Sequence, residues 1–341
     1  LMYRIMKINM NEWIASVISS KERVAIPIMT HSGIEIIGKT VKDAVTDGVV
    51  HYEAIMALAE KYPSAASSVI MDLTVEAEAF GADIVFSDHE VPNIVGRLVS
   101  TVEDIDKLVV PSLEVGRVKQ YLKANALVAR NSTKPVFSGC IGPYSLAGRL
   151  FDMSEIMMAI YIEPDTIKKL LDKCTQFITI YCKALKEVGV NGVLIAEPAA
   201  GLLSNEACLE FSSVYVRRII EALQDDSFSV ILHNCGNVGQ CTDAMVATGA
   251  AGYHFGNAID MVETLKRCPS NVLVMGNIDP VGIFKMAAPE TIYEQTLQLL
   301  NATSEYANFV LSSGCDTPPR VPFENIDMFY KALNDYNAGN I

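Results

Sequence analysis

The stretch Ser229–Phe255 reads SVILHNCGNVGQCTDAMVATGAAGYHF and carries the pattern that decides the fold. It opens with a short apolar run, continues through polar and glycine residues into a helical pattern, and closes with a second apolar run, Gly252–Phe255. Strands of a parallel sheet that are covered on both faces appear as such continuous apolar runs, because neither face meets water. The stretch therefore predicts two parallel strands joined by a helix.

The same alternation continues outward in both directions along the chain. Eight apolar runs end in polar or glycine residues, and we expect each to form a strand: Val24–Met29, Val69–Met71, Pro135–Cys140, Gly192–Ile195, Ser229–Leu232, Gly252–Phe255, Val272–Met275 and Phe309–Leu311. Strands that alternate with helices, without an antiparallel signal, predict a parallel sheet of the α/β class. Eight such units predict closure into a (β/α)8 TIM barrel.

Helix boundaries follow from local signals. Pro164 stands at the first helical position after Glu163, and Gly189 follows the last periodic residue, so a long helix is predicted to end at Glu187. Ser204 and Pro289 open two further helical patterns, and we expect a helix to begin at each of them.

Two regions exceed the minimal repeating unit. An N-terminal helical extension, containing NEWIASVISS at residues 11–20, precedes the first strand. Residues 81–111 hold short apolar pieces around Pro92 and Gly96, which predicts a hairpin-like insertion after the second strand and then a short helix. Because no linker, repeat or low-complexity tract interrupts the pattern, we expect residues 1–341 to form one domain.

The composition excludes several classes of protein. The chain has 341 residues, a net charge of −13 and a pI of about 4.9, whereas a nucleic-acid-binding protein normally presents a basic face. No apolar run reaches the roughly 18 residues needed for a membrane span. Eight cysteines are scattered along a long chain without a secretory signal pattern, so we expect free thiols and a cytoplasmic location.

The most specific chemical pattern is His233-x-Cys235, which follows the fifth predicted strand. Active sites of barrels lie at the C-terminal ends of the strands, and residues i and i+2 of an extended chain point the same way. An imidazole and a thiolate placed so can bind one zinc ion, at about 2.0–2.1 Å and about 2.3 Å. Cys315, after the eighth strand, is the best-placed third ligand, and three protein ligands would leave a fourth position open, as in catalytic zinc sites.

Alternatives to this metal site stay open. A free cysteine usually behaves as a small buried apolar residue, and a His-x-Cys pair alone is a weak signal. Cys140 and Cys241 are rival ligands. The strands that precede His233 and Cys315 are not neighbours, so their loops must fold over the barrel mouth to meet.

Further polar residues follow the predicted strands and are candidates for contact with a substrate. We expect catalytic roles, such as orienting substrate or ligands, for Asp72, Glu197 and Asp279, although Asp72 fits a helix N-cap equally well. Substrate-binding residues are expected to be His31, Asn237 and Tyr144. His51 and His254 are expected to be structural.

Four segments together resemble the uroporphyrinogen decarboxylase superfamily, and more closely its branch of zinc-dependent methylcobamide:thiol (coenzyme M-type) methyltransferases. They are DLTVEAEAFGAD (72–83), HNCGN (233–237), GNIDP (276–280) and GCDTPPRVPFENI (314–326). The resemblance covers residues 20 to 335 in order. It implies that His233, Cys235 and Cys315 are zinc ligands. The decarboxylases carry an arginine-rich segment after the first strand and lack the three ligands, whereas residues 29–39, MTHSGIEIIGK, contain no arginine.

The resemblance also implies a reaction. A methyl group would move from a methylcobamide, a corrinoid substrate that is not covalently bound, to a small-molecule thiol such as coenzyme M or to a pterin acceptor. The corrinoid would come from a separate corrinoid-binding protein, because the chain has no D-x-H-x-x-G corrinoid motif. The alternatives are a decarboxylase acting without metal and a non-catalytic corrinoid-binding subunit.

Overall fold

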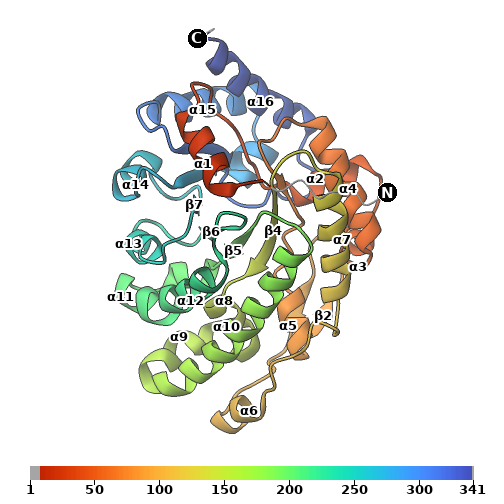
Figure 1. Cartoon of the computed structure of the whole chain (residues 1–341), viewed down its shortest axis with the longest axis vertical. Coiled ribbons are helices and arrows are strands. Elements are labelled where there is room, and N and C mark those ends of the chain that lie inside the picture. Colours follow the sequence, from red (N-terminus) through yellow and green to blue (C-terminus); the bar gives the residue numbers. More distant parts are fainter. Residues whose placement is uncertain (1–7, 340–341) are drawn as a thin grey trace.

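A parallel sheet of seven strands forms most of the barrel wall in the computed structural model, which describes residues 8–339 (Figure 1). In the order of the sheet the strands are β1 (Ser67–Ser68), β4 (Val136–Ile141), β5 (Gly192–Ala196), β6 (Ser229–Asn234), β7 (Gly252–Phe255), β8 (Leu273–Ile278) and β9 (Phe309–Ser313). All neighbouring pairs are parallel. Six of these strands overlap predicted runs, which confirms the predicted α/β class and its parallel sheet.

The extended segment around Ala25 closes the barrel between β9 and β1. Ala25 bridges Leu311 of β9 in the parallel sense, and the Ile26 amide donates to the Leu311 carbonyl at 2.9 Å. On the other side the Ala65 amide, just before β1, donates to the Ala25 carbonyl at 3.0 Å. The predicted first strand is therefore present as a bridging segment, and the wall is continuous as a TIM barrel requires.

The second predicted strand is displaced from the position that the sequence suggested. Pairing is confined to Ser67 and Ser68, whereas Val69–Met71 was expected. The Ile70 amide donates to His51 Nε2 at 3.1 Å, and the Met71 amide donates to Thr30 Oγ1 at 3.1 Å. Side chains thus replace the ladder partners of these two residues, which ends the strand early.

Helices surround the sheet, as the alternating pattern predicts. Their bounds are α1 (Met10–Ser19), α2 (Thr30–Ile36), α3 (Val41–Thr46), α4 (Gly48–Lys61), α5 (Val75–Phe80), α6 (Val102–Lys107), α7 (Val118–Asn131), α8 (Pro143–Phe151), α9 (Met153–Ile162), α10 (Pro164–Glu187), η1 (Pro198–Leu202), α11 (Asn205–Cys208), η2 (Leu209–Ser213), α12 (Val214–Leu223), α13 (Thr242–Val246), α14 (Met261–Arg267), η3 (Pro280–Lys285), α15 (Pro289–Ala302) and α16 (Phe323–Ala338). Both proline-initiated helices, α10 and α15, begin where the sequence predicts. The helix expected after Ser204 is divided by the π-helical turn η2. Among the described helices, none combines the length and apolarity needed to cross a membrane.

The N-terminal extension covers one end of the barrel. Helix α1 places Met10 and Ile14 in a buried cluster with inward-facing strand residues such as Phe137 and Leu194. The Met10 amide also donates to the carbonyl of Asp226, which precedes β6, so α1 lies at the N-terminal ends of the strands. The opposite end of the barrel is left for a functional site. Residues 1–7, part of the predicted extension, lie outside the described residues.

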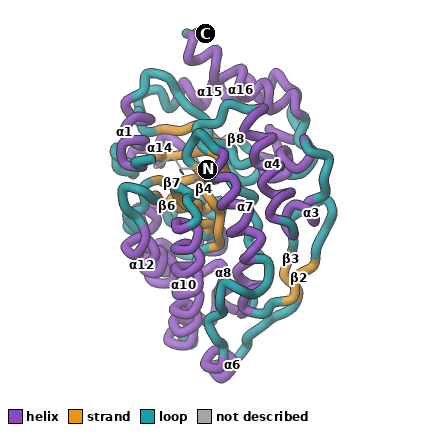
Figure 2. Tube along the Cα trace, turned by 45° about the vertical axis from the view of Figure 1, so that its right-hand side comes forward, coloured by secondary structure: helices purple, strands orange, loops and turns teal. Residues whose placement is uncertain are grey.

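The predicted insertion after the second strand is a true hairpin. Strands β2 (Asp83–Val85) and β3 (Asn93–Val95) pair antiparallel, and α6 follows. Figure 2 shows the hairpin set apart from the strands of the barrel. The described structure thus confirms both additions to the basic barrel, whereas one domain spanning residues 1–341 remains a prediction.

Candidate metal centre

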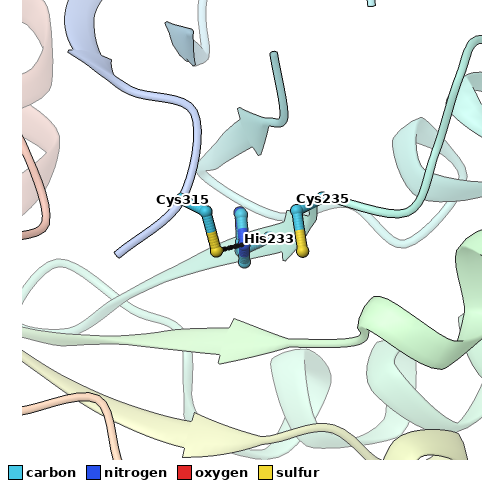
Figure 3. A group of neighbouring side chains, drawn as sticks. All are labelled: His233, Cys235 and Cys315. Carbon is cyan, nitrogen blue, oxygen red and sulfur yellow. Dashed lines mark hydrogen bonds between the residues drawn. The ribbon is translucent and has the colours of Figure 1, made fainter. Parts of the chain in front are cut away.

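Three side chains converge at the C-terminal end of the barrel, as Figure 3 shows. His233 is the second-to-last residue of strand β6, Cys235 directly follows β6, and Cys315 follows β9. Their nitrogen and sulfur atoms all lie within 4.8 Å of one another. The His233 Nε2 to Cys315 Sγ distance is 3.7 Å, and two ligands of a tetrahedral zinc ion, at the usual bond lengths, stand about 3.6 Å apart. The donor set and its spacing therefore fit zinc.

Two glycines allow loops from non-adjacent strands to meet. A Cβ on Gly256, after β7, would lie 2.8 Å from the Cys235 carbonyl oxygen. A Cβ on Gly314 would lie 2.7 Å from the Asn257 amide nitrogen. The loop after β7 is thus wedged between the segments that carry Cys235 and Cys315, and only glycine permits so close a backbone approach. This close packing brings Cys315 across the barrel mouth to His233 and Cys235.

The ring of His233 is hydrogen-bonded to His254, a residue that was expected to be structural. The two residues are register partners in β6 and β7, and their Nδ1 atoms lie 2.8 Å apart. His254 Nε2 lies 2.8 Å from Ser312 Oγ, which in turn lies 2.8 Å from the Ile26 carbonyl oxygen. A hydrogen-bonded chain therefore connects the candidate ligand to the segment that closes the barrel.

This series of hydrogen bonds admits only one consistent arrangement of protons when both imidazole rings are neutral. The Ile26 carbonyl can only accept, so the Ser312 hydroxyl donates to it and accepts from His254 Nε2–H. His254 Nδ1 is then bare and accepts from His233 Nδ1–H, which also lies 3.3 Å from the His254 carbonyl oxygen. Burial keeps the pKa of His254 well below its usual value, consistent with a neutral ring. His233 Nε2 is left with its lone pair toward the cysteines, as metal ligation requires.

The thiols of Cys235 and Cys315 lie within 4.8 Å of each other, and their interaction separates their acidities. The interaction with Cys315 lowers the pKa of Cys235 to about 7. The interaction with Cys235, together with burial, raises the pKa of Cys315. Cys235 is thus the thiol that ionises first in the metal-free protein.

A cavity of about 200 Å³ opens in front of the three side chains. His233, Cys235 and Cys315 line one part of it, and Val91–Asn93 of the hairpin line another. Arg149 of α8 is the one arginine or lysine among the described residues that line it. The cavity thus combines three potential metal donors, the Arg149 cation, the Asp316 carboxyl and apolar walls.

The predicted catalytic residue Asp72 is engaged elsewhere. Its Oδ1 accepts hydrogen bonds from the Thr74 amide and hydroxyl, and its Oδ2 pairs with Arg117 and accepts from Tyr121. Asp72 is buried and is absent from the cavity lining that the described residues form. The expectation that Asp72 is a helix N-cap is wrong, because Thr74 is the N-cap of α5 and Asp72 only accepts hydrogen bonds from Thr74 in the turn before it. The part of Asp72 in catalysis stays a prediction.

The predicted catalytic residue Glu197 is also buried and fully engaged. Its carboxylate accepts from the amides of Tyr144 and Ser145, at the beginning of α8, and from the hydroxyl of Ser212. Although burial raises the pKa of Glu197, these hydrogen bonds favour its charged form. Glu197 thus anchors the start of α8, and direct contact with a ligand stays a prediction.

The remaining predicted residues form hydrogen bonds within the protein or are buried away from the cavity. Asp279 caps η3 through the Val281 and Gly282 amides, and Asn237 organises the loop after β6 by accepting from the Cys241 amide. None of these residues belongs to the cavity lining among the described residues: Asp279, Asn237, Tyr144 and His31. His31 Nδ1 lies 3.0 Å from the Thr317 carbonyl, and the Tyr144 ring is fully buried. Their substrate or catalytic roles stay predictions.

The rival cysteine ligands lie outside the cluster. Cys140 Sγ lies 3.7 Å from Cys182 Sγ, and Cys241 Sγ contacts the carbonyls of Ala200 and Leu203 at 3.5 and 3.3 Å. Neither belongs to the described group of metal-ligating side chains, which favours Cys315 as the third donor. All eight cysteines are free.

Sequence reasoning missed His254 and Arg149. The role of His254 could have been predicted by aligning the apolar runs that precede the polar residues of β6 and β7. This alignment places His254 beside His233. Arg149 lies six residues beyond Pro143 within a helical pattern, and no local signal separates it from a surface arginine.

Comparisons with known proteins place the chain in a family. The model of the uroporphyrinogen decarboxylase (URO-D) family matches residues 14–336, so the chain belongs to this family. Over 282 residues it is 30% identical to the methylcobamide:CoM methyltransferase MtbA of Methanosarcina acetivorans, covering 79% of each chain. The uroporphyrinogen decarboxylase of Alcanivorax borkumensis is 27% identical over 286 residues and 80% of each chain.

A solved structure extends the similarity to three dimensions. A methyltransferase from Methanosarcina mazei superimposes with a TM-score of 0.86 at 20% identity, over 96% of this chain and 99% of that one. At that identity the likeness shows the fold. Together these comparisons confirm the family that the four segments indicated, and its methyltransferase branch.

Proposed function

We propose that the protein transfers a methyl group from a methylated corrinoid to a thiol, with a zinc ion held by His233, Cys235 and Cys315. The convergence of these three donors in a cavity, at a spacing that fits zinc, is the observation that carries the proposal. The similarity to enzymes named methylcobamide:CoM methyltransferase supports the same reaction. A decarboxylase would have no use for the three donors.

The protein contributes position and protonation state. His254 holds the His233 ring so that Nε2 faces the cysteines, and the cavity walls limit water around the acceptor. A bound zinc ion would supply Lewis-acid chemistry, keeping an acceptor thiol deprotonated at neutral pH although its ordinary pKa is about 8.5. The thiol proton passes to solvent. The sulfur then forms a bond to the methyl carbon while the carbon–cobalt bond breaks, and both electrons stay on cobalt, which changes from Co(III) to Co(I).

The corrinoid is proposed to arrive on a separate corrinoid-binding protein, and the acceptor to be a small-molecule thiol. The cavity has room for a small acceptor, whereas a corrinoid must approach from outside the barrel mouth. Eight free cysteines fit a reducing compartment, so we place the reaction in the cytoplasm.

Metal analysis and a spectral assay test the proposal together. Purified protein should contain about one zinc ion per chain, and Cys235→Ser and Cys315→Ser should each lose most of it. Cys241→Ser is the matched control, because Cys241 is a free, buried cysteine outside the cluster. With methylcobalamin and a thiol, the wild type should produce cob(I)alamin and both ligand variants should not. Metal-replete protein without zinc, or full activity in Cys315→Ser, would contradict the proposal.

A further inference from the structure

Asn277 lies in the segment GNIDP (276–280), near the end of strand β8. Its side-chain nitrogen lies 3.0 Å from the Gly256 carbonyl oxygen and 2.9 Å from the Ile259 carbonyl oxygen. Because carbonyl oxygens only accept hydrogen bonds, the group that faces them is the NH2 of the amide, and it donates to both. Asn277 therefore binds the two ends of the loop that follows β7.

This loop, residues 256–259, separates the segments that carry the two candidate cysteine ligands, and we call it the wedge loop. A Cβ on Gly256, its first residue, would lie 2.8 Å from the Cys235 carbonyl oxygen. A Cβ on the glycine that precedes Cys315 would lie 2.7 Å from the Asn257 amide nitrogen. The wedge loop thus touches the backbone beside both thiols, and its position sets the distance between them.

Strand β8 also holds the segment that carries Cys315. The Gly314 amide donates at 2.8 Å to the carbonyl of Ile278, which directly follows Asn277. In the sheet, β8 lies between β7 and β9, so its end stands below both segments. The end of β8 therefore binds the Cys315 segment through its backbone and the wedge loop through one side chain. Of these two attachments, only the side chain can be removed by substitution.

Asn277 does not meet a ligand of the cavity itself. It is absent from the cavity lining that the described residues form, and its NH2 group is committed to the wedge loop. Its influence on the candidate metal centre must pass through the wedge loop, which makes Asn277 a positioning residue.

We propose that Asn277 positions the wedge loop so that Cys235 and Cys315 stand at the spacing of two ligands of one zinc ion. Two thiolates of a tetrahedral ion, each about 2.3 Å from the metal, stand about 3.8 Å apart. Without the Asn277 amide, the Gly256 and Ile259 carbonyls lose a donor and the wedge loop is free to shift. The inference rests on the proposed function in one respect, because it takes zinc to be the ion that the three donors bind.

The variant Asn277→Asp tests the proposal, because it replaces the NH2 by an oxygen of similar size and sets acceptor against acceptor. Its zinc affinity, measured by competition with a colorimetric chelator, should fall about 10- to 100-fold. The cobalt(II)-substituted variant should show a weaker thiolate-to-cobalt charge-transfer absorption, because one cysteine no longer reaches the ion. Asn277→Ser removes the amide without adding a charge and should give the same two losses. Asn277→Gln keeps the amide and should retain part of both signals.

Asn308→Asp is the matched control. The Asn308 amide donates to the carbonyls of Pro269 and Val272 at 3.1 and 2.9 Å, the same arrangement of one amide and two carbonyls. Asn308 directly precedes β9, at the opposite end of the barrel from the candidate metal centre. Both variants should lower the Tm, whereas only Asn277→Asp should weaken zinc binding. Equal losses of affinity in the two variants, or wild-type affinity in Asn277→Asp, would overturn the proposal.

A substitution in the wedge loop tests the same path from its other end. Gly256→Ala places a Cβ 2.8 Å from the Cys235 carbonyl oxygen, so the wedge loop must shift there and zinc binding should weaken. If Asn277 acts through this loop, the double variant Asn277→Asp/Gly256→Ala should lose less affinity than the two single losses added together. Full additivity of the two losses would contradict a shared path.

A measurement on metal-depleted protein separates this inference from the proposed function. Phenylarsine oxide joins two neighbouring thiols: two arsenic–sulfur bonds form, the arsenic–oxygen bond breaks, and the oxygen leaves with both thiol protons as water. Binding to Cys235 and Cys315 should be about 10-fold weaker in Asn277→Asp than in wild type or Asn308→Asp, because the second thiol is misplaced. Binding that remains in Cys235→Ser measures the background from the other cysteines.

The two proposals can therefore fail separately. Weaker arsenical binding in Asn277→Asp, in a protein that holds no zinc when metal-replete, would overturn the metal function and keep the positioning role. Zinc-dependent methyl transfer, with arsenical binding and zinc affinity unchanged in Asn277→Asp, would overturn the positioning role and keep the reaction.

Discussion

The Nδ1 atoms of His233 and His254 lie 2.8 Å apart, on register partners of two adjacent parallel strands. Two neutral imidazoles can hydrogen-bond in this way only when one Nδ1 donates and the other accepts. The onward contacts of His254 to Ser312 and Ile26 make His254 the acceptor. The relationship fixes which nitrogen of His233 is free to bind a metal.

Replacement of His254 should weaken zinc binding without removing a ligand. We expect His254→Leu to lower zinc affinity about 10- to 100-fold, as loss of a ligand's hydrogen-bond partner does. His254→Gln, which keeps an acceptor, should retain more affinity. Competition with a colorimetric chelator measures the change. His51→Leu removes another fully buried imidazole far from the cluster and serves as the control. Wild-type affinity in His254→Leu would contradict the role.

Removal of the metal should lower stability but preserve the fold. The donors lie at the barrel mouth, with His233 near the end of β6 and the two cysteines in the loops after β6 and β9, whereas the buried apolar clusters are formed without them. A ligand at 100 times its Kd stabilises the native state by about 2.7 kcal/mol, so chelation should lower the Tm by a few degrees. Far-UV circular dichroism should change little. Loss of the helical signal on chelation would mean that the site is needed for folding.

The pH dependence of stability should contain a contribution from Glu76. Burial raises its pKa in the folded protein to about 8, against 4.5 for an ordinary carboxyl group. The folded state therefore binds the extra proton between these values. The contribution of the Glu76 carboxyl group to the stability of the folded protein is fully present below pH 4.5 and is lost as the pH rises through 8. Urea unfolding of wild type and Glu76→Gln should show the variant gaining, relative to wild type, up to a few kcal/mol between pH 5 and pH 8. A difference that stays constant with pH would refute this.

Substitutions in the buried pair of Asp72 and Arg117 can distinguish a structural role of Asp72 from a catalytic role. Asp72→Asn leaves Arg117 without its main counter-charge, and we expect a loss of roughly 3 kcal/mol in the free energy of unfolding. The double variant Asp72→Leu/Arg117→Met should recover much of that loss, because both charges are gone. If stability returns and methyl transfer does not, Asp72 has a catalytic part; if both return, its part is structural.

The sequence by itself determined the class of fold and the pairing of two of the three candidate metal donors, His233 and Cys235. Apolar runs spaced by helical patterns follow from burial on both faces of a parallel sheet, and the proline starts of α10 and α15 follow from fixed backbone torsion. The approach of His233 to Cys235 is equally local, because alternate residues of an extended chain share a side.

The tertiary structure alone decided the rest, because it depends on contacts between distant segments. Cys315 reaches His233, 82 residues away, only because Gly256 and Gly314 let a third loop pack between their segments. The partner of His233 depends on the register of β6 against β7. No local periodicity encodes a register or the path of a loop, so the cavity and its lone arginine became visible only in the folded chain.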